Sequence, residues 1–332
     1  MRRFLRAASI ACAAIAIAAA VAVLWWWQTV YGDRSFPAQQ TQVVVARGST
    51  LHEIAAQLAR EGVIGNATAF LLLAKLRGEE TGVRAGEYRF AAHETQDRVL
   101  HALLTGGAQV AAWVTIPEGF TAKEIALRLQ EEGVGDAAAF EQGFLHDRMT
   151  IDGTATVNLE GFLFPSTYLV PIGDSVGAVE GLLTDQFRRE LPTDAAARAR
   201  ALHVTVPQAV TVASLVEREA KAEADRPLIA SVIYNRLRIG MPLQVDATIE
   251  YALPEHKDVL SFADLRIDSP YNTYLYAGLP PTPIANPGLP SLEAALHPSK
   301  SDFLYYVYCG NGRHVFARTL SEHQANVARC LH

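Results

Sequence analysis

No charged side chain occurs in the 21 residues from Ala7 to Trp27, and this run constrains the chain more than any other feature. At about 1.5 Å per residue, a helix of this length crosses a hydrocarbon core about 30 Å thick. Arginines at 2, 3 and 6 precede the run and tryptophans at 25–27 end it, as in a cytoplasmic flank and an interfacial aromatic belt. A cleaved signal peptide is the alternative, although its apolar core is usually shorter. We therefore predict a cytoplasmic stub at 1–6, a retained transmembrane helix at 7–27, and a chain that continues outside the cytoplasm.

The composition of the remaining chain excludes several classes of protein. The formal net charge is −6 and no long run of either sign occurs, so no nucleic-acid partner is indicated. The sequence contains neither a His-Glu-x-x-His nor a Ser-x-x-Lys motif, and its histidines lack the spacing of metal ligands. We predict no metal and no cofactor. Residues 173–177 (GDSVG) fit a serine-hydrolase string, but a short run interrupted by proline precedes them, so a helix cap is the favoured interpretation.

Two cysteines, Cys309 and Cys330, follow the apolar run. They are too few for a zinc cluster or a disulfide-rich scaffold. An oxidising compartment permits a disulfide between them. The alternative is that Cys309 points into the core of a β-hairpin, which the sequence predicts over 304–316.

A small module is predicted after a polar linker at 28–42. The expected elements are a strand at 43–45, a turn at 48–50, a helix from Leu51 with apolar residues at helical spacing, and a returning strand within 83–90. This order resembles a LysM-like module over 43–112. The resemblance implies glycan binding, and a purely structural spacer is the alternative.

The module's first half recurs 71 residues later in the chain. The paired positions are Gly48 and Gly119, Ile54 and Ile125, Leu58 and Leu129, Gly62 and Gly133, and, after a gap of one residue, Phe70 and Phe140. We predict that 43–63 and 114–134 each form strand, turn and helix, and that 114–140 repeats the LysM-like unit. It would lie inside a catalytic domain at 113–332 that mixes helices with short strands, so the expected fold class is α+β.

After these exclusions, the catalytic chemistry that the sequence still allows is acid–base catalysis by carboxylates, and its leading use outside the cytoplasm is glycoside cleavage. A helix is predicted over 207–222, and on it Glu219 shares a face with Val212, Leu215 and Val216. An apolar flank raises the pKa of a carboxyl and keeps it protonated, as a general acid requires. Glu217 falls toward the polar edge of the same helix. Glu217 and Glu160 stay open as alternative acids, and Glu219 could instead be paired with an arginine.

Several longer motifs occur in a fixed order around this helix. They are EGFLFP at 160–165, ASLVERE at 213–219, ASVIYNRL at 230–237, IGMPLQ at 239–244, YNTY at 271–274, GLPP at 278–281 and NPG at 286–288. Together they resemble the MltG (YceG-like) family of endolytic murein transglycosylases. In that family the second glutamate of the Glu-x-Glu pair is catalytic, which implies Glu219. Asp246-Ala247-Thr248 departs from the family's usual Asp-Pro-Thr, and Ser166 stands where an aspartate is usual.

The resemblance implies an inner-membrane enzyme whose catalytic domain lies in the periplasm. Such an enzyme cleaves MurNAc–GlcNAc β-1,4 bonds in peptidoglycan, leaves 1,6-anhydroMurNAc ends and terminates strand elongation, and a peptidoglycan synthase is a plausible partner. The expected substrate contacts are Asn235, Gln244, Asp246, Tyr271 and Asn272. A muramidase-type hydrolase stays open, since Asp246 or Glu160 would serve as its second carboxylate about 5 or 6.5–9.5 Å from the first. A non-catalytic peptidoglycan-binding tether is the third possibility.

Overall fold

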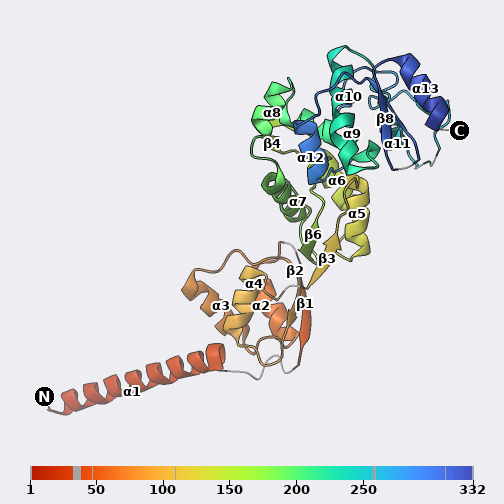
Figure 1. Ribbon diagram of the computed structural model, residues 1–332. Coiled ribbons are helices and arrows are strands. Elements are labelled where there is room, and N and C mark those ends of the chain that lie inside the picture. The colour runs from red at the N-terminus through yellow and green to blue at the C-terminus, as the bar shows by residue number, and fades with distance from the viewer. Residues whose placement is uncertain are drawn as a thin grey trace. The chain divides into compact units, whose positions relative to one another are not determined.

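The computed structural model describes residues 2–32, 39–46, 48–108, 110–255, 257, 259–310 and 312–330. The chain folds into two compact units, and each is described by itself. The first extends to Ala112 and includes Val170–Asp174, and the second consists of Trp113–Leu169 and Ser175–His332. Figure 1 shows the order of the elements along the chain.

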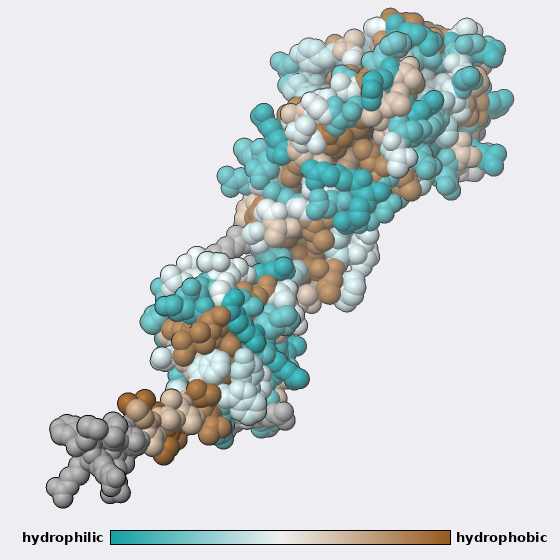
Figure 2. All heavy atoms as spheres, turned by 90° about the vertical axis from the view of Figure 1, so that its left-hand side faces the viewer, coloured by the Kyte–Doolittle hydropathy of each residue, from teal (hydrophilic) through white to brown (hydrophobic). Residues whose placement is uncertain are grey.

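The N-terminal helix α1 (Arg2–Trp27) is the one described helix that is long and apolar enough to cross a membrane. Every residue from Cys12 to Trp25 is exposed, and Figure 2 shows hydrophobic side chains on the surface of this helix. A π-helical turn, η1 (Gln28–Gly32), follows, and its Val30 is fully buried in the core of the first unit. The prediction that residues 28–32 belong to a polar linker is therefore wrong. Because Val30 is buried in the core, this turn is part of the folded unit. Residues 33–38 of that linker lie outside the described residues.

The first unit contains the elements predicted for the small module. Strand β1 (Thr41–Val45) leads through a turn to α2 (Leu51–Arg60) and α3 (Ala67–Arg77), and β2 (Gly86–Phe90) pairs with β1 antiparallel. Helix α4 (Gln96–Thr105) completes the unit. Alternate residues of both strands are buried, so one face of this two-stranded sheet packs on the helices.

The order of elements predicted for the repeated segments is present in both. Strand β3 (Ala111–Thr115) leads to two helices of the second unit, α5 (Ala122–Glu131) and α6 (Ala137–His146). The turns contain Gly48 and Gly119 with φ of 75° and 80°, a conformation that favours glycine. Capping boxes begin the two helices in the same way, with Thr50 and Glu53 in α2 and Thr121 and Glu124 in α5. Strand β3 also pairs with a later strand, β6 (Thr167–Pro171).

The rest of the second unit is built around α9 (Val206–Glu219), which packs against α8 (Ala195–Ala201), α10 (Arg226–Arg238), α11 (Asp246–Ala252) and α12 (Leu289–Leu296). The other elements are the strands β4 (Thr150–Ile151) and β5 (Thr154–Ala155), helix α7 (Val176–Glu190), and the 3-10 turns η2 (Glu223–Asp225) and η3 (Asp264–Arg266). The mixture of helices and short strands agrees with the predicted α+β class. Ser175 caps α7, as the cap interpretation of 173–177 predicted.

One local prediction for this region is wrong. Helix α9 ends at Glu219 rather than at 222, because Ala220 adopts an extended conformation, with φ −69° and ψ 127°. Asp225 precedes α10 but makes no capping hydrogen bond. Its carboxylate instead accepts from the backbone N–H of His314, at 2.7 Å, and lies 3.0 Å from Nδ1 of that side chain.

The C-terminal segment forms the predicted hairpin, β7 (Tyr305–Tyr308) with β8 (His314–Ala317), followed by α13 (Leu320–Cys330). Cys309 and Cys330 form a disulfide with a Cα–Cα distance of 4.5 Å. The disulfide therefore links the end of β7 to the last described helix, and the pairing that the sequence permitted is confirmed.

Candidate active site

A cavity of about 980 Å³ lies in the second unit, where α9 ends. Its wall combines the loop at 118–120, the end of α9, the segment at 243–247, and the β7–β8 hairpin. Four of the candidate site residues singled out from the sequence, Glu217, Glu219, Gln244 and Asp246, line this cavity together. Segments distant in the sequence thus meet around the predicted acid.

Glu219 is the last residue of α9 and is partly buried in the cavity wall. Its Oε2 accepts a hydrogen bond of 2.9 Å from the Tyr306 hydroxyl. Burial, helped by the charge of Asp246, raises the pKa of Glu219 to about 7, although the Tyr306 hydrogen bond and the charge of Lys221 oppose this shift. At neutral pH this carboxyl is populated in both protonation states, as a group that acts as acid and then as base requires.

Gln244 and Asp246 are held in the wall by the backbone and side chains of a neighbouring loop. Gln244 has φ of 51°, a left-handed conformation that costs free energy for a residue other than glycine. The Gln244 N–H donates to the Thr273 carbonyl oxygen at 3.0 Å, which secures this conformation. Asp246 accepts a hydrogen bond from the Tyr274 hydroxyl. Both side chains are exposed and face the cavity, so their polar atoms are available to a ligand.

The other three predicted contact residues are not brought to this cavity. Asn235 is 5% exposed and Nδ2 donates to the Ser301 and Phe303 carbonyl oxygens, each at 2.9 Å. Asn272 is fully buried, and its amide bonds to backbone groups of its own loop. The Tyr271 hydroxyl lies 2.8 Å from that of Thr282. Since their polar atoms are used within the protein, we do not carry these three forward as substrate contacts.

Glu160, an alternative acid, is 1% exposed and does not line the large cavity. Burial raises its pKa to about 8, although four donated bonds oppose this. The donors are the Ala122 N–H to both oxygens, the Tyr251 hydroxyl, and Asn286 Nδ2. Through these hydrogen bonds the buried carboxyl of Glu160 connects the start of α5 to the loop at 286–288, which is a structural role.

Helical periodicity placed Glu217 toward the polar edge of the helix, but the structure buries its side chain. Its side chain is 7% exposed and forms an ion pair with Arg226 at 3.3 Å. It also accepts from the Gly288 N–H at 3.1 Å. Its carboxylate is thus committed to a cation and a backbone donor, whereas Glu219 has a single hydroxyl donor among the described residues.

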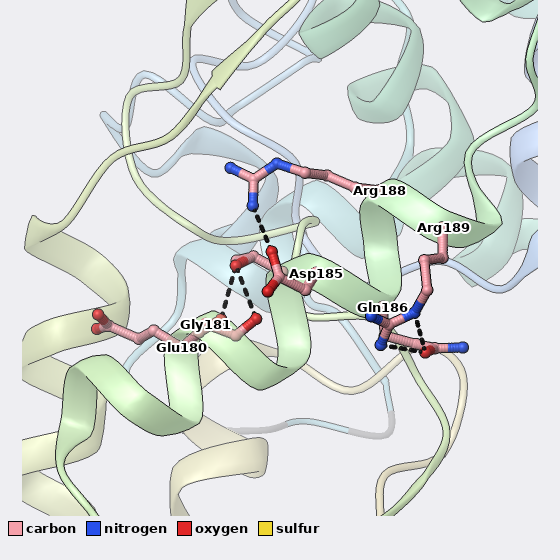
Figure 3. Close-up of polar contacts among 7 residues, drawn as sticks. Glu180, Gly181, Asp185, Gln186, Arg188 and Arg189 are labelled. Carbon is pink, nitrogen blue, oxygen red and sulfur yellow. Dashed lines mark hydrogen bonds and ion pairs between the residues drawn. The ribbon is translucent and has the colours of Figure 1, made fainter.

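A third buried carboxyl shows that a raised pKa alone does not mark the site. Burial and the neighbouring Asp147 raise the pKa of Glu180 to about 7. Glu180 lies on α7, and in Figure 3 its side chain extends away from the Asp185–Arg188 and Gln186–Arg189 contacts of the same helix. It does not line the cavity around Glu219. Location therefore separates Glu219 from Glu180.

Several cavity residues were missed by sequence reasoning. They are Glu118, Arg218, Lys221, Arg236, Glu250, Tyr274 and Tyr306. Arg218 pairs with Glu250 at 3.0 Å, and Arg236 donates to carbonyl oxygens. Lys221 forms no hydrogen bond or ion pair with any described residue, so it is the unpaired cation nearest in sequence to Glu219. Arg218, Arg236 and Tyr274 stand within the quoted motifs, but no sequence signal pointed to the side chains of these seven residues as part of the cavity wall.

The comparisons with known proteins match this whole arrangement rather than one motif. The model of the YceG-like family matches residues 43–329. This chain belongs to the YceG-like family. An endolytic murein transglycosylase of Bacillus subtilis (strain 168) is 36% identical over 296 residues, covering 84% of this chain and 81% of the relative. One of Streptococcus pneumoniae (serotype 2, strain D39) is 32% identical and covers 86% of this chain, but the match spans 57% of that protein.

A solved structure extends the family likeness to the fold. The 2.6 Å crystal structure of a yceG-like protein from Listeria monocytogenes matches with a TM-score of 0.58 and 31% identity. The match covers 87% of this chain and 99% of that one. This YceG-like chain therefore resembles a family member in fold as well as in sequence.

Proposed function

We propose that this YceG-like chain is an endolytic murein transglycosylase, a lyase, in which Glu219 alone supplies the proton transfers. The observation that carries the proposal is the position of Glu219. Of the three carboxyls whose pKa is raised to about 7 or 8, it is the one that lines the large cavity. Curated relatives of the family bear the name of this activity.

The reaction needs one acid–base group and no added water. Neutral Glu219 donates its proton to the oxygen that joins MurNAc C1 to GlcNAc O4, and the bond from C1 to that oxygen breaks. GlcNAc leaves with a free 4-hydroxyl group while C1 gains oxocarbenium character. The Glu219 carboxylate then takes the proton of the C6 hydroxyl of the same MurNAc, and O6 bonds to C1. The tethered nucleophile gives a high effective molarity and a 1,6-anhydro end.

The cavity wall also suggests how the sugars are held. Gln244 and Asp246 offer polar atoms beside Glu219, and we propose that they bind sugar hydroxyl groups. The free ammonium of Lys221 suits a carboxylate on the muramic acid residue or on its peptide. These contacts would fix MurNAc with its C6 hydroxyl close to Glu219.

The N-terminal features fit an anchored enzyme that works on glycan close to the membrane. We propose that α1 spans the inner membrane with the arginines at 2, 3 and 6 in the cytoplasm. The antiparallel pair β1–β2 with α2 and α3 between its strands fits a LysM-like glycan-binding module at 43–112. The substrate is then a nascent peptidoglycan strand, and a membrane-bound peptidoglycan synthase is the partner that this placement favours.

The test compares Glu219→Gln with Glu180→Gln in the full chain, using purified sacculi. Glutamine keeps the shape but carries no transferable proton, so Glu219→Gln should lose about 10²–10⁴-fold in rate. Glu180→Gln is the matched control, since its pKa is also raised but it lies away from the cavity, and it should stay active. Glu217→Gln is unsuitable because it would leave Arg226 without its partner.

Mass spectrometry of the products separates the alternatives. Strands ending in 1,6-anhydroMurNAc support the proposal. Reducing ends from the wild type would establish a hydrolase, with Asp246 as the second carboxylate to examine. No cleavage by the wild type, with retained binding to sacculi, would establish a tether.

A further inference from the structure

Helix α10 holds the segment that leads into β7. Asn235 donates to the carbonyl oxygens of Ser301 and Phe303, each at 2.9 Å. The next residue, Arg236, donates from Nε to the Leu304 carbonyl oxygen at 2.6 Å. Three of the four carbonyl groups from Ser301 to Leu304 are thus fixed by two adjacent side chains. The backbone enters β7 in a defined position relative to α10.

The far end of β7 is fixed as well. The disulfide from Cys309 to Cys330 joins the residue after β7 to the end of α13. Between these two attachments, Tyr306 projects from β7 into the cavity and reaches Glu219. The hydroxyl of Tyr306 is therefore placed by restraints on both sides of its strand.

The Tyr306 hydroxyl contacts one oxygen of the Glu219 carboxyl, Oε2, at 2.9 Å. Burial and the charge of Glu219 raise the pKa of Tyr306 well above its ordinary range, so it remains a phenol and a hydrogen-bond donor. Oε1 of Glu219 receives no hydrogen bond from the described residues. The two oxygens of the acid are therefore inequivalent.

We infer that Tyr306 is the positioning residue for Glu219: by donating to Oε2 it holds the acid's proton on Oε1, the oxygen left free for the glycosidic bond. In the neutral acid, Oε2 is then the carbonyl oxygen, which accepts from the phenol, and Oε1 carries the proton. After proton transfer, the same bond stabilises the carboxylate that must accept the C6 hydroxyl proton. The inference rests on the proposed function, because it assigns a role relative to Glu219.

A hydrogen bond donated to a carboxylate lowers the pKa of that carboxyl, so removing the Tyr306 hydroxyl should raise the pKa of Glu219. Tyr306→Phe should move the pH–rate profile of kcat toward alkaline pH by about one unit. The value of kcat should fall about tenfold, because the proton would be distributed over both oxygens and the carboxylate formed after its transfer would lose a hydrogen bond, while KM should change less than about twofold. Incorporation of 3-fluorotyrosine at 306 keeps the side chain and strengthens the donor, so the profile should move toward acidic pH.

Tyr234→Phe is the matched control. Its hydroxyl donates to the Ala295 carbonyl oxygen at 3.0 Å, and it does not line the cavity. Removing this hydroxyl should reduce stability without moving the pH profile. Opposite shifts from the two Tyr306 variants, with none from Tyr234→Phe, would support the inference, since a merely structural tyrosine gives no such pair.

Two results would overturn it. One is a pH profile that coincides with the wild type in both Tyr306 variants. The other is a Tyr306→Phe loss as large as that of Glu219→Gln, which would make the tyrosine itself a proton-transfer group. If Tyr306→Phe fails to fold, the fluorotyrosine protein decides by itself. Failure of the proposed function is separate, because it would appear as activity in Glu219→Gln.

Discussion

Replacing Asn235 by alanine separates a structural role from a role in binding sugar. The substitution removes three hydrogen bonds from a residue that is 5% exposed: two donated to the Ser301 and Phe303 carbonyl oxygens, and one accepted from the partly exposed Arg238 at 3.0 Å. Each such bond contributes about 0.5–1.5 kcal/mol, and a buried acceptor left without a partner costs about 1–3 kcal/mol. We expect the free energy of unfolding to fall by about 2–4 kcal/mol.

Calorimetry of the full chain in detergent measures this effect. For a unit of this size, such a loss lowers Tm by roughly 5–15 °C. Asn326→Ala on α13 is the control, since its amide oxygen accepts from exposed Arg329, and it should change Tm by a few degrees at most. Activity on sacculi should show a reduced kcat with unchanged KM, because β7 carries Tyr306. A normal Tm together with a tenfold higher KM would refute the reasoning and restore Asn235 as a substrate contact.

Three further results are expected. Burial and Asp147 raise the pKa of Glu180 to about 7, so the folded state is most stable with this carboxyl protonated, below about pH 4.5, and loses stability as the pH rises through 7. In thermal melts, Glu180→Gln should therefore match the wild type at pH 4.5 and exceed its free energy of unfolding by on the order of 1–3 kcal/mol at pH 8. Cys309→Ser should lower stability by about 3 kcal/mol and reduce kcat, and equal rates with and without a reductant in the wild type would contradict this. Lys221→Met should raise Kd several-fold for glycan strands that carry carboxylates and leave Kd unchanged for uncharged chitin oligosaccharides, as a binding assay at low salt would measure.

The apolar surroundings of Glu219, the proposed acid, were predictable because they are partly local. Val212, Leu215 and Val216 lie one or two turns before Glu219 on the same face, and helical periodicity reveals them without a structure. The pairing of Glu217 was not predictable. Its partners are Arg226, beyond the end of the helix, and the Gly288 N–H, 71 residues along the chain. A helical wheel has no information about such partners.

Tertiary contacts also decided the helix boundary and the amide roles. Residues 220–224 (AKAEA) are strong helix formers, so local propensity favours a longer helix, yet Ala220 is extended. Asn235 looked available because its partners, Ser301 and Phe303, lie 66 and 68 residues later. Sequence alone cannot distinguish a polar side chain that binds substrate from one whose hydrogen bonds are made to the backbone of a distant segment.

The ending of α9 at Glu219 has a consequence for how the acid can be altered. The last turn of a helix presents carbonyl groups that have no partner within it, equivalent to about half a negative charge. A carboxylate at that position is disfavoured by about 0.3–1 kcal/mol, which works in the same direction as burial. Part of what keeps Glu219 protonated is therefore the aligned peptide dipoles of residues 206–219. No replacement of a cavity side chain removes that part, so variants of the wall should retune the acid without returning it to the pKa of a free glutamate.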